Sequence, residues 1–368
     1  MRAALRTSRL LAPPRAWSST RRPYSLVTRC VDASPKDVKR AAAGGKRLEA
    51  DANEIAENLN HASAVASTSS GVTSPRAQRT LGRLSKYAAH GDTITGFFEP
   101  GLLDLYLTLD ATQTRLGASG PLCEIGVYHG KSFVPLALMR QKNENAIAID
   151  CFEDQAVNLD NSGEGDRGAF TRNVEEAMRV CGVAEEEDDG DDINDWLQIL
   201  QMDSAKLEND ASPLTAATCD EKIRIFSIDG CHTADATVSD LHVASDSLHP
   251  NGVVIVDDVF NPDWPGVVSG IFNWRADVNG KTSGNSTAND PLDSSWHSHG
   301  LEPFAIGFGK VFMSRPGVRD LYFEEFCGIS KQSDEKKEKK AMRKTAQFMD
   351  RECAVFRHGW ISTFHGNE

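Results

Sequence analysis

Short apolar runs alternate with helical patterns through the middle of the chain, and this alternation restricts the fold more than any other feature. The runs of strand length cover 121–127, 146–151, 197–202, 223–229 and 253–257. Helical patterns fill the gaps at 132–141, 168–181, 234–248 and 265–275. Because helical crossovers connect parallel strands, the sequence predicts an α/β fold, Rossmann-like, with a mostly parallel sheet and helices on both faces.

The ends of this domain are marked by changes in composition. An apolar stretch from Ile94 to Leu109 predicts a helix that leads into the first strand. Apolar runs at 303–308 and 310–314 are separated only by Gly309, which predicts an antiparallel pair that ends the sheet. We therefore expect a domain at 94–315, preceded by a linker and N-terminal helical extension at 32–93 and followed by a charged C-terminal helical extension at 316–368.

Residues 1–31 contain no acidic residue, although the chain as a whole has a net charge of −13. Arginines lie among Ala, Leu and Ser at Arg2, Arg6, Arg9, Arg15, Arg21, Arg22 and Arg29. This composition predicts an organelle transit peptide and a mitochondrial location, with the plastid or a simple basic tail as alternatives. The net charge argues against nucleic acid as a partner, and no apolar run is long enough for a membrane span.

A glycine turn follows the first predicted strand. Its polar and glycine positions are Glu124, Gly126, Tyr128, Gly130 and Ser132. Such a turn before a helix lets backbone amides approach the polar end of a ligand. We expect Ser132 to bind a carboxylate and Glu124 to accept from an ammonium group. A dinucleotide fingerprint has glycine where this chain has Tyr128, so an NAD-dependent oxidoreductase is disfavoured but stays an alternative.

The next two strand ends carry further candidates for an adenosine-type cofactor. Asp150 ends the second strand, where an acid can hydrogen-bond ribose hydroxyls. Asp203 and Ser204 follow the third strand and are placed for contacts to adenine. Each aspartate has a purely structural alternative as a cap of the following turn.

The fourth and fifth strands end in Asp229, His232, Asp257 and Asp258. Adjacent parallel strands open into one crevice at this edge, so the carboxylates converge there and need a compensating cation or proton. Asp229, Asp257 and Asp258 are candidate ligands of Mg²⁺ or a similar divalent ion. His232 is a candidate base for a substrate hydroxyl, and Asp229 shares the catalytic assignment. Capping and backbone contacts are the alternative roles.

Together these motifs resemble the class I, S-adenosylmethionine-dependent methyltransferases, especially the metal-dependent O-methyltransferases similar to catechol O-methyltransferase and the bacterial methyltransferase family 24. The turn of the catechol enzyme reads Glu-Leu-Gly-Ala-Tyr-Cys-Gly-Tyr-Ser and matches Glu124 to Ser132. The resemblance implies that this turn binds the methionine moiety and that Asp150 binds ribose. It also implies a seven-stranded sheet whose last strand is antiparallel.

The acidic positions carry the resemblance further. A metal-binding Asp followed three positions later by a basic catalytic residue corresponds to Asp229 and His232, with histidine in place of lysine. The Asp-Asn metal pair corresponds to Asp257 and Asp258. No counterpart of the catechol-binding acid is present, so the resemblance implies O-methylation of a different small-molecule hydroxyl.

The resemblance leaves a second class of function open, which is a catalytically silent, methyltransferase-like assembly factor in an organelle. Intact acidic and histidine positions favour the enzyme over this alternative. The sequence names neither the substrate nor the oligomeric state.

Overall fold

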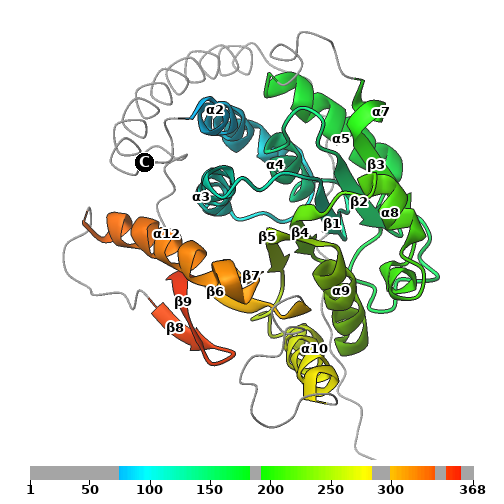
Figure 1. Cartoon of the computed structure of the whole chain (residues 1–368). Coiled ribbons are helices and arrows are strands. Elements are labelled where there is room, and N and C mark those ends of the chain that lie inside the picture. The colour runs from blue at the N-terminus through cyan, green and yellow to red at the C-terminus, as the bar shows by residue number, and fades with distance from the viewer. Residues whose placement is uncertain (1–73, 183–191, 284–298, 336–344, 358–368) are drawn as a thin grey trace, which may run out of the picture. The chain divides into compact units, whose positions relative to one another are not determined.

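The computed structural model describes residues 74–182, 192–283, 299–335 and 345–357 (Figure 1). The expected transit peptide and most of the expected linker lie outside the described residues. In the described part of the chain, no helix has both the length and the apolar character that a membrane crossing requires.

The fold is built on one sheet of nine strands in the order β3-β2-β1-β4-β5-β7-β6-β9-β8 (Figure 1). All strands except β7 and β8 run in the same direction. This confirms the predicted mixed α/β fold with a mostly parallel sheet. The strand bounds are β1 Leu122–Ile125, β2 Ala146–Asp150, β3 Leu197–Gln201, β4 Ile223–Ile228, β5 Leu248–Val256, β6 Glu302–Gly307, β7 Lys310–Ser314, β8 Thr345–Phe348 and β9 Arg351–Phe356.

Strand register brings the predicted site residues to one edge of the sheet. Ile125, the last residue of β1, lies opposite Ile149 of β2 and Ile228 of β4. Ile228 in turn lies opposite Val256, the last residue of β5. The segments that follow β1, β2, β4 and β5 therefore all start from the same edge, where ligands bind in open parallel sheets.

The helices are α2 Pro75–His90, α3 Leu102–Arg115, α4 Phe133–Leu138, α5 Arg167–Val180, α7 Ile193–Trp196, α8 Ser212–Thr218, α9 Ala234–Ser247, α10 Pro265–Ser283 and α12 Pro316–Glu335, with 3-10 turns η1 Gly91–Thr93 and η2 Ser204–Glu208. Side chains cap several of them. Ser74 accepts from the Ala77 amide at the start of α2, and Thr233 accepts from the Ala236 amide at the start of α9.

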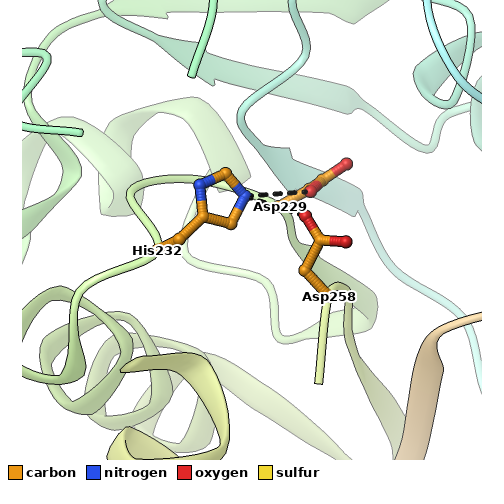
Figure 2. Close-up of side chains that lie close together, drawn as sticks. All are labelled: Asp229, His232 and Asp258. Atoms are coloured by element: carbon orange, nitrogen blue, oxygen red, sulfur yellow. Dashed lines mark ion pairs between the residues drawn. The ribbon is translucent and has the colours of Figure 1, made fainter. Parts of the chain in front are cut away.

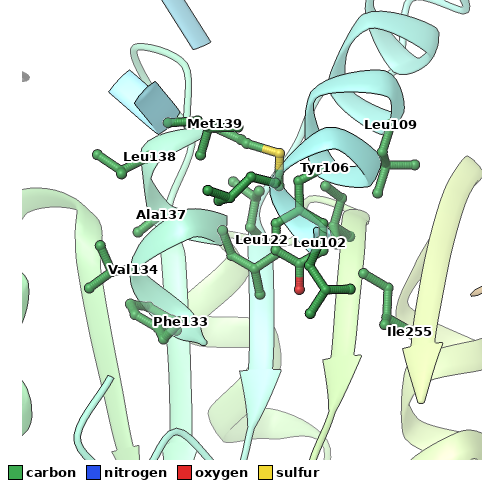
Figure 3. Packing of buried hydrophobic residues seen from close by; sticks show 14 of the residues in the cluster. Leu102, Tyr106, Leu109, Leu122, Phe133, Val134, Ala137, Leu138, Met139 and Ile255 are labelled. Atoms are coloured by element: carbon green, nitrogen blue, oxygen red, sulfur yellow. The ribbon is translucent and has the colours of Figure 1, made fainter. Parts of the chain in front are cut away.

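Two apolar layers cover the two faces of the sheet. Along β5, Val253 and Ile255 join the layer formed with α2, α3, α4, α5 and α12, whereas Val254 and Val256 join the layer formed with α8, α9 and α10. This alternation follows from the two-residue period of a strand. Figure 3 shows the first layer where Tyr106 of α3 packs beside Leu122 of β1.

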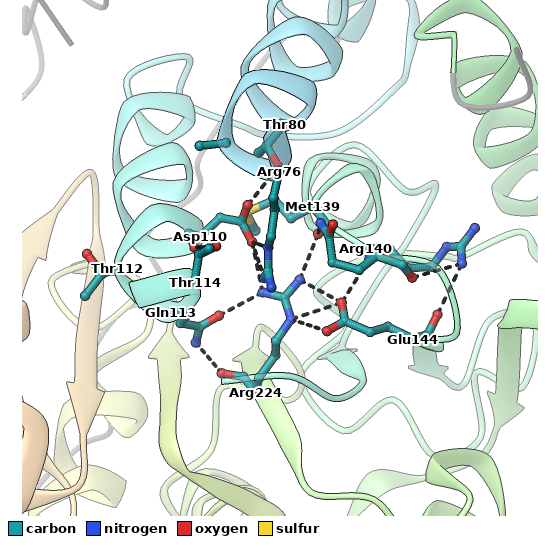
Figure 4. Close-up of polar contacts among 12 residues, drawn as sticks. Arg76, Thr80, Asp110, Thr112, Gln113, Thr114, Met139, Arg140, Glu144 and Arg224 are labelled. Atoms are coloured by element: carbon teal, nitrogen blue, oxygen red, sulfur yellow. Dashed lines mark hydrogen bonds and ion pairs between the residues drawn. The ribbon is translucent and has the colours of Figure 1, made fainter. Parts of the chain in front are cut away.

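A buried ionic network joins the first helical layer to the sheet (Figure 4). The guanidinium of Arg224, on β4, donates to Glu144, Gln113 and Asp110 and to the Met139 carbonyl. The side chains of Arg224 and Asp110 are fully buried, and Asp110 also accepts from Thr80 and Arg76 of α2. Each charge is thus paired, which offsets the cost of its burial.

The structure adds detail at both expected domain ends. Helix α2 lies within the expected N-terminal helical extension at 32–93, and its Ala77, Leu84 and Tyr87 are buried. Its many arginines and serines conceal this apolar stripe in the sequence. After α12, residues 345–356 form β8 and β9 instead of continuing the expected helical extension, and they add two strands beyond the pair that was expected to end the sheet.

Candidate functional site

The glycine turn after β1 packs tightly against the segment after β4. Gly126 has φ +81°, and a Cβ atom built there would lie 1.8 Å from the Asp229 carbonyl oxygen. Gly130 has φ +95°, and Tyr128, between them, also has a left-handed φ of 49°. The turn therefore requires glycine at position 126 for both its conformation and its close backbone contact.

Glu124 lies beneath this turn and is fully buried. The hydroxyls of Ser132 and Ser227 donate to its two carboxylate oxygens at 3.3 and 3.1 Å. Burial raises the pKa of Glu124 to about 7, against the opposing effects of Lys310 and the two serines. Glu124 and Ser132, both predicted from the sequence, thus lie together.

Asp150, the last residue of β2, holds the backbone of the segments that follow β1 and β2. Its carboxylate accepts from the amide of Tyr128 at 2.8 Å and from the amide of Phe152 at 2.6 Å. Burial raises the pKa of Asp150 despite these bonds. The contact to Tyr128 places Asp150 beside the glycine turn, and its ribose role stays a prediction.

Asp203 and Ser204 follow β3 at the same edge. The Asp203 side chain accepts from the Ala205 amide, so it caps η2, the alternative that the sequence offered. Ser204 begins η2 and lies near the buried carboxyl of Asp240. Their contact to adenine stays a prediction.

Asp229, His232 and Asp258 come together at the ends of β4 and β5 (Figure 2). One ligand-type atom from each lies within 4.8 Å of the others. His232 Nε2 lies 3.0 Å from Asp258 Oδ2 and 4.0 Å from Asp229 Oδ1. Asp258 has a left-handed φ of 57°, a backbone strain of the kind found where a side chain must be aimed.

Charges in this group strongly affect one another. Burial and the neighbouring Asp257 raise the pKa of Asp229 well above its ordinary value. Burial favours neutral His232, but hydrogen bonds to Asp258 and Asp160 outweigh it and raise the pKa of His232. For Asp258, burial is likewise outweighed by hydrogen bonds from His232 and Asn261, which lower its pKa.

Asp257, the third metal ligand expected from the sequence, lies outside this group and has a different partner. Its carboxylate accepts a hydrogen bond from the buried ammonium of Lys310, at the start of β7. Burial opposes the charge of Lys310, but Asp257 and Asp229 outweigh it and raise the pKa of that lysine. In this structure an internal cation pairs with Asp257, and a role of Asp257 as a metal ligand stays a prediction.

Two further residues, Asp160 and Trp264, contact the imidazole of His232, and the sequence analysis did not predict these contacts. Asp160, in the connection between β2 and α5, lies 2.7 Å from His232 Nδ1. Trp264 stacks on the imidazole with a centroid distance of 4.4 Å and an interplanar angle of 18°. No pattern around Asp160 marks it, because its partner is 72 positions away in the chain.

Comparison with solved structures finds several O-methyltransferases. NovP is 19% identical over 59% of this chain and 80% of its own, with a TM-score of 0.37. TomG from Streptomyces achromogenes, in complex with SAM, is 16% identical over 58% of this chain and 82% of its own, with a TM-score of 0.34. MycE, with Mg and SAH, is 14% identical over 63% of this chain and 54% of its own, with a TM-score of 0.39.

These low identities and scores say nothing about the substrate of this chain. No curated protein sequence matches it. Residues 123–259, which contain the glycine turn and the group at Asp229, His232 and Asp258, match the model of methyltransferase family 24, described as "Methyltransferase domain". This match confirms, for residues 123–259, the resemblance to methyltransferase family 24 that the sequence motifs indicated.

Proposed function

We propose that the protein transfers a methyl group from S-adenosylmethionine to the hydroxyl oxygen of a small molecule, with a divalent metal ion at the acidic group. The observation that carries this proposal is the direct packing of Gly126 against the Asp229 carbonyl. The glycine turn, which we propose to bind the cofactor, thus lies beside a group of two carboxylates and an imidazole. A methyl donor on the turn would thus lie next to residues suited to activating a hydroxyl.

The residues around the turn suit the different parts of the cofactor. Ser132 and the amides that follow Gly126 would hold the carboxylate of the cofactor, and Glu124 would accept from its ammonium group. Asp150 is placed for the ribose hydroxyls, and Asp203 and Ser204 for adenine.

The carboxylates of Asp229 and Asp258 fit a divalent cation, and the imidazole of His232 lies beside them. Carboxylate oxygens are the ligands that suit Mg²⁺ and Mn²⁺. A bound ion would orient a substrate hydroxyl and lower its pKa. Lys310 holds Asp257 beside this group, so Asp257 positions the strand end.

His232 is the proposed base of the transfer. Its Nδ1 is held by Asp160, which leaves Nε2 directed toward Asp229 and Asp258. With S-adenosylmethionine bound, Nε2 would take the substrate proton as the hydroxyl oxygen bonds to the methyl carbon and the carbon–sulfur bond breaks, with S-adenosylhomocysteine as the product. Asp258 is one of the two contacts that raise the pKa of His232, so a cation on Asp258 favours the neutral, proton-accepting imidazole.

The test is methyl transfer from labelled S-adenosylmethionine, with Mg²⁺, to an organelle metabolite extract, read by mass spectrometry. We expect His232→Gln and Asp258→Asn to lower turnover by about 100-fold or more while calorimetry shows cofactor binding retained. Asp263→Asn, an exposed aspartate in the segment after β5, is the matched control and should keep full activity.

Two results would contradict parts of this proposal. Full activity of Asp258→Asn in the presence of a chelator rules out the metal role. Tight cofactor binding without methyl transfer to any metabolite supports the silent assembly factor in place of the enzyme.

We further propose that residues 1–31 direct the protein to mitochondria, with the plastid as the alternative. The arginines of this segment and its lack of acids support the proposal. A reporter fused to residues 1–45 should enter the organelle, and a cytosolic reporter contradicts the proposal.

A further inference from the structure

The connection between β2 and α5, residues 151–166, runs across the end of β1 to reach the segment after β4. It begins at β2, and its Asp160 contacts His232 in the β4–α9 connection. Strand β1 lies between β2 and β4 in the sheet. This connection therefore crosses the edge of the sheet at which the glycine turn emerges.

Close contacts along the connection confirm this path. A Cβ atom built on Gly163 would lie 3.3 Å from the ring of Tyr128, in the glycine turn. A Cβ built on Gly165 would lie 3.3 Å from Asp150 Oδ1. The connection thus passes over two residues that are proposed to surround the cofactor.

Asp160 links this connection to His232 through two hydrogen bonds. Its Oδ2 accepts from the His232 backbone amide at 2.6 Å and lies 2.7 Å from Nδ1 of the ring. The side chains of Asp160 and His232 are only 7% and 10% exposed, so solvent competes little for this contact. The opposite ring nitrogen, Nε2, faces Asp258.

The loop around Asp160 is held in shape by its own side chains. Asn158 donates from Nδ2 to the Gly163 carbonyl at 2.8 Å, and its Oδ1 accepts from the Asn161 amide at 3.1 Å. Asp160 Oδ1 accepts from the Ser162 amide at 3.0 Å. These bonds aim the second carboxylate oxygen of Asp160 at His232.

We propose that Asp160 is the positioning residue of His232, and that the 151–166 connection orients this histidine only while it is closed over the glycine turn. This inference rests on the proposed function of the site, which it deepens by coupling cofactor enclosure to orientation of the base. Carboxylates that hold the far nitrogen of a functional histidine fix both its tautomer and its ring orientation.

The test combines two readouts that do not require catalysis. In nitrogen-15 NMR spectra, with the His232 signal assigned from His232→Gln, we expect Nδ1 to carry the proton in the native protein. Asp160→Ala should lose this fixed tautomer, and Asp160→Asn should retain part of it, because its amide oxygen still accepts. Amide hydrogen exchange of 151–166 should become about tenfold faster or more in Asp160→Ala. Asp154→Asn, an exposed aspartate of the same connection, is the matched control and should change neither readout.

The second part of the test uses S-adenosylhomocysteine, the product formed from the cofactor. S-adenosylhomocysteine should slow exchange of 151–166 in the native protein, and Asp160→Ala should lower kcat about 10- to 100-fold with a smaller change in KM. Unchanged NMR and exchange in Asp160→Ala overturn the positioning role, and bound product without protection of 151–166 overturns the closure. Failure of the product to bind overturns the proposed function itself, together with the catalytic part of this inference.

Discussion

The buried carboxyl of Glu124 makes the free energy of unfolding depend on pH, and the substitution Glu124→Gln should remove this dependence. Its pKa is raised from 4.5 to about 7, mainly by burial. The folded protein therefore binds this proton more tightly than the unfolded chain. The stabilising contribution is fully present below the unfolded value of 4.5 and is lost as the pH rises through about 7.

The magnitude follows from these two values. Each pH unit between 4.5 and about 7 changes the free energy of unfolding by about 1.4 kcal/mol, which gives about 3 kcal/mol over the whole interval. No solvent screening reduces this figure, because the side chain is fully buried. In Glu124→Gln the amide preserves size and hydrogen bonding to Ser132 and Ser227 but does not titrate.

The assay is urea unfolding of both proteins between pH 4.5 and 8, followed by tryptophan fluorescence. Comparison of the two proteins removes contributions of other raised acids, such as Asp240, from the result. We expect the native protein to lose about 3 kcal/mol relative to Glu124→Gln as the pH rises. A difference that does not change with pH refutes the buried, protonated state of Glu124.

Two further predictions concern the scaffold. Arg224→Met leaves the buried carboxylates of Asp110 and Glu144 without their shared cation. Urea unfolding should then show a free energy of unfolding lower by about 3–5 kcal/mol. A loss below about 1 kcal/mol contradicts the stabilising role of this network. Gly126→Ala places a Cβ against the Asp229 carbonyl at a left-handed φ and should cost about 2 kcal/mol or more, read from the thermal midpoint. Gly82→Ala, in α2 with no atom within 4 Å of the new Cβ, is its control and should raise stability by about 0.5–1 kcal/mol. Equal effects of the two glycine substitutions rule out the proposed packing at the turn.

Much of the fold was predictable because its strands and the turn at Gly309 correspond to short patterns of neighbouring residues. Apolar runs gave the strands from β1 to β5, and Gly309 marked the β6–β7 hairpin. The hairpin of β8 and β9 was missed, since its turn places Met349 and Asp350 at left-handed φ values of 50° and 59°, without the Asn-Gly signal typical of such turns.

The positions of the site residues at strand ends were predictable from the sequence, but several of their side-chain contacts were not. Positions such as Asp229 and Asp258 follow directly from strand ends, since parallel strands share one edge. The pairing of Lys310 with Asp257 depends on where β7 inserts in the sheet, which is a property of the folded chain. The contact of Asp160 with His232 likewise depends on the path of a connection that has no periodic pattern.

The most direct test of the central claim is isothermal titration of the protein with S-adenosylmethionine and, separately, with NAD. We predict one S-adenosylmethionine site that is lost or strongly weakened in Gly126→Ala but retained in Asp263→Asn, and no binding of NAD. Preferential binding of NAD, or S-adenosylmethionine binding that is unaffected by Gly126→Ala in a folded protein, would contradict the assignment of this turn as the cofactor site.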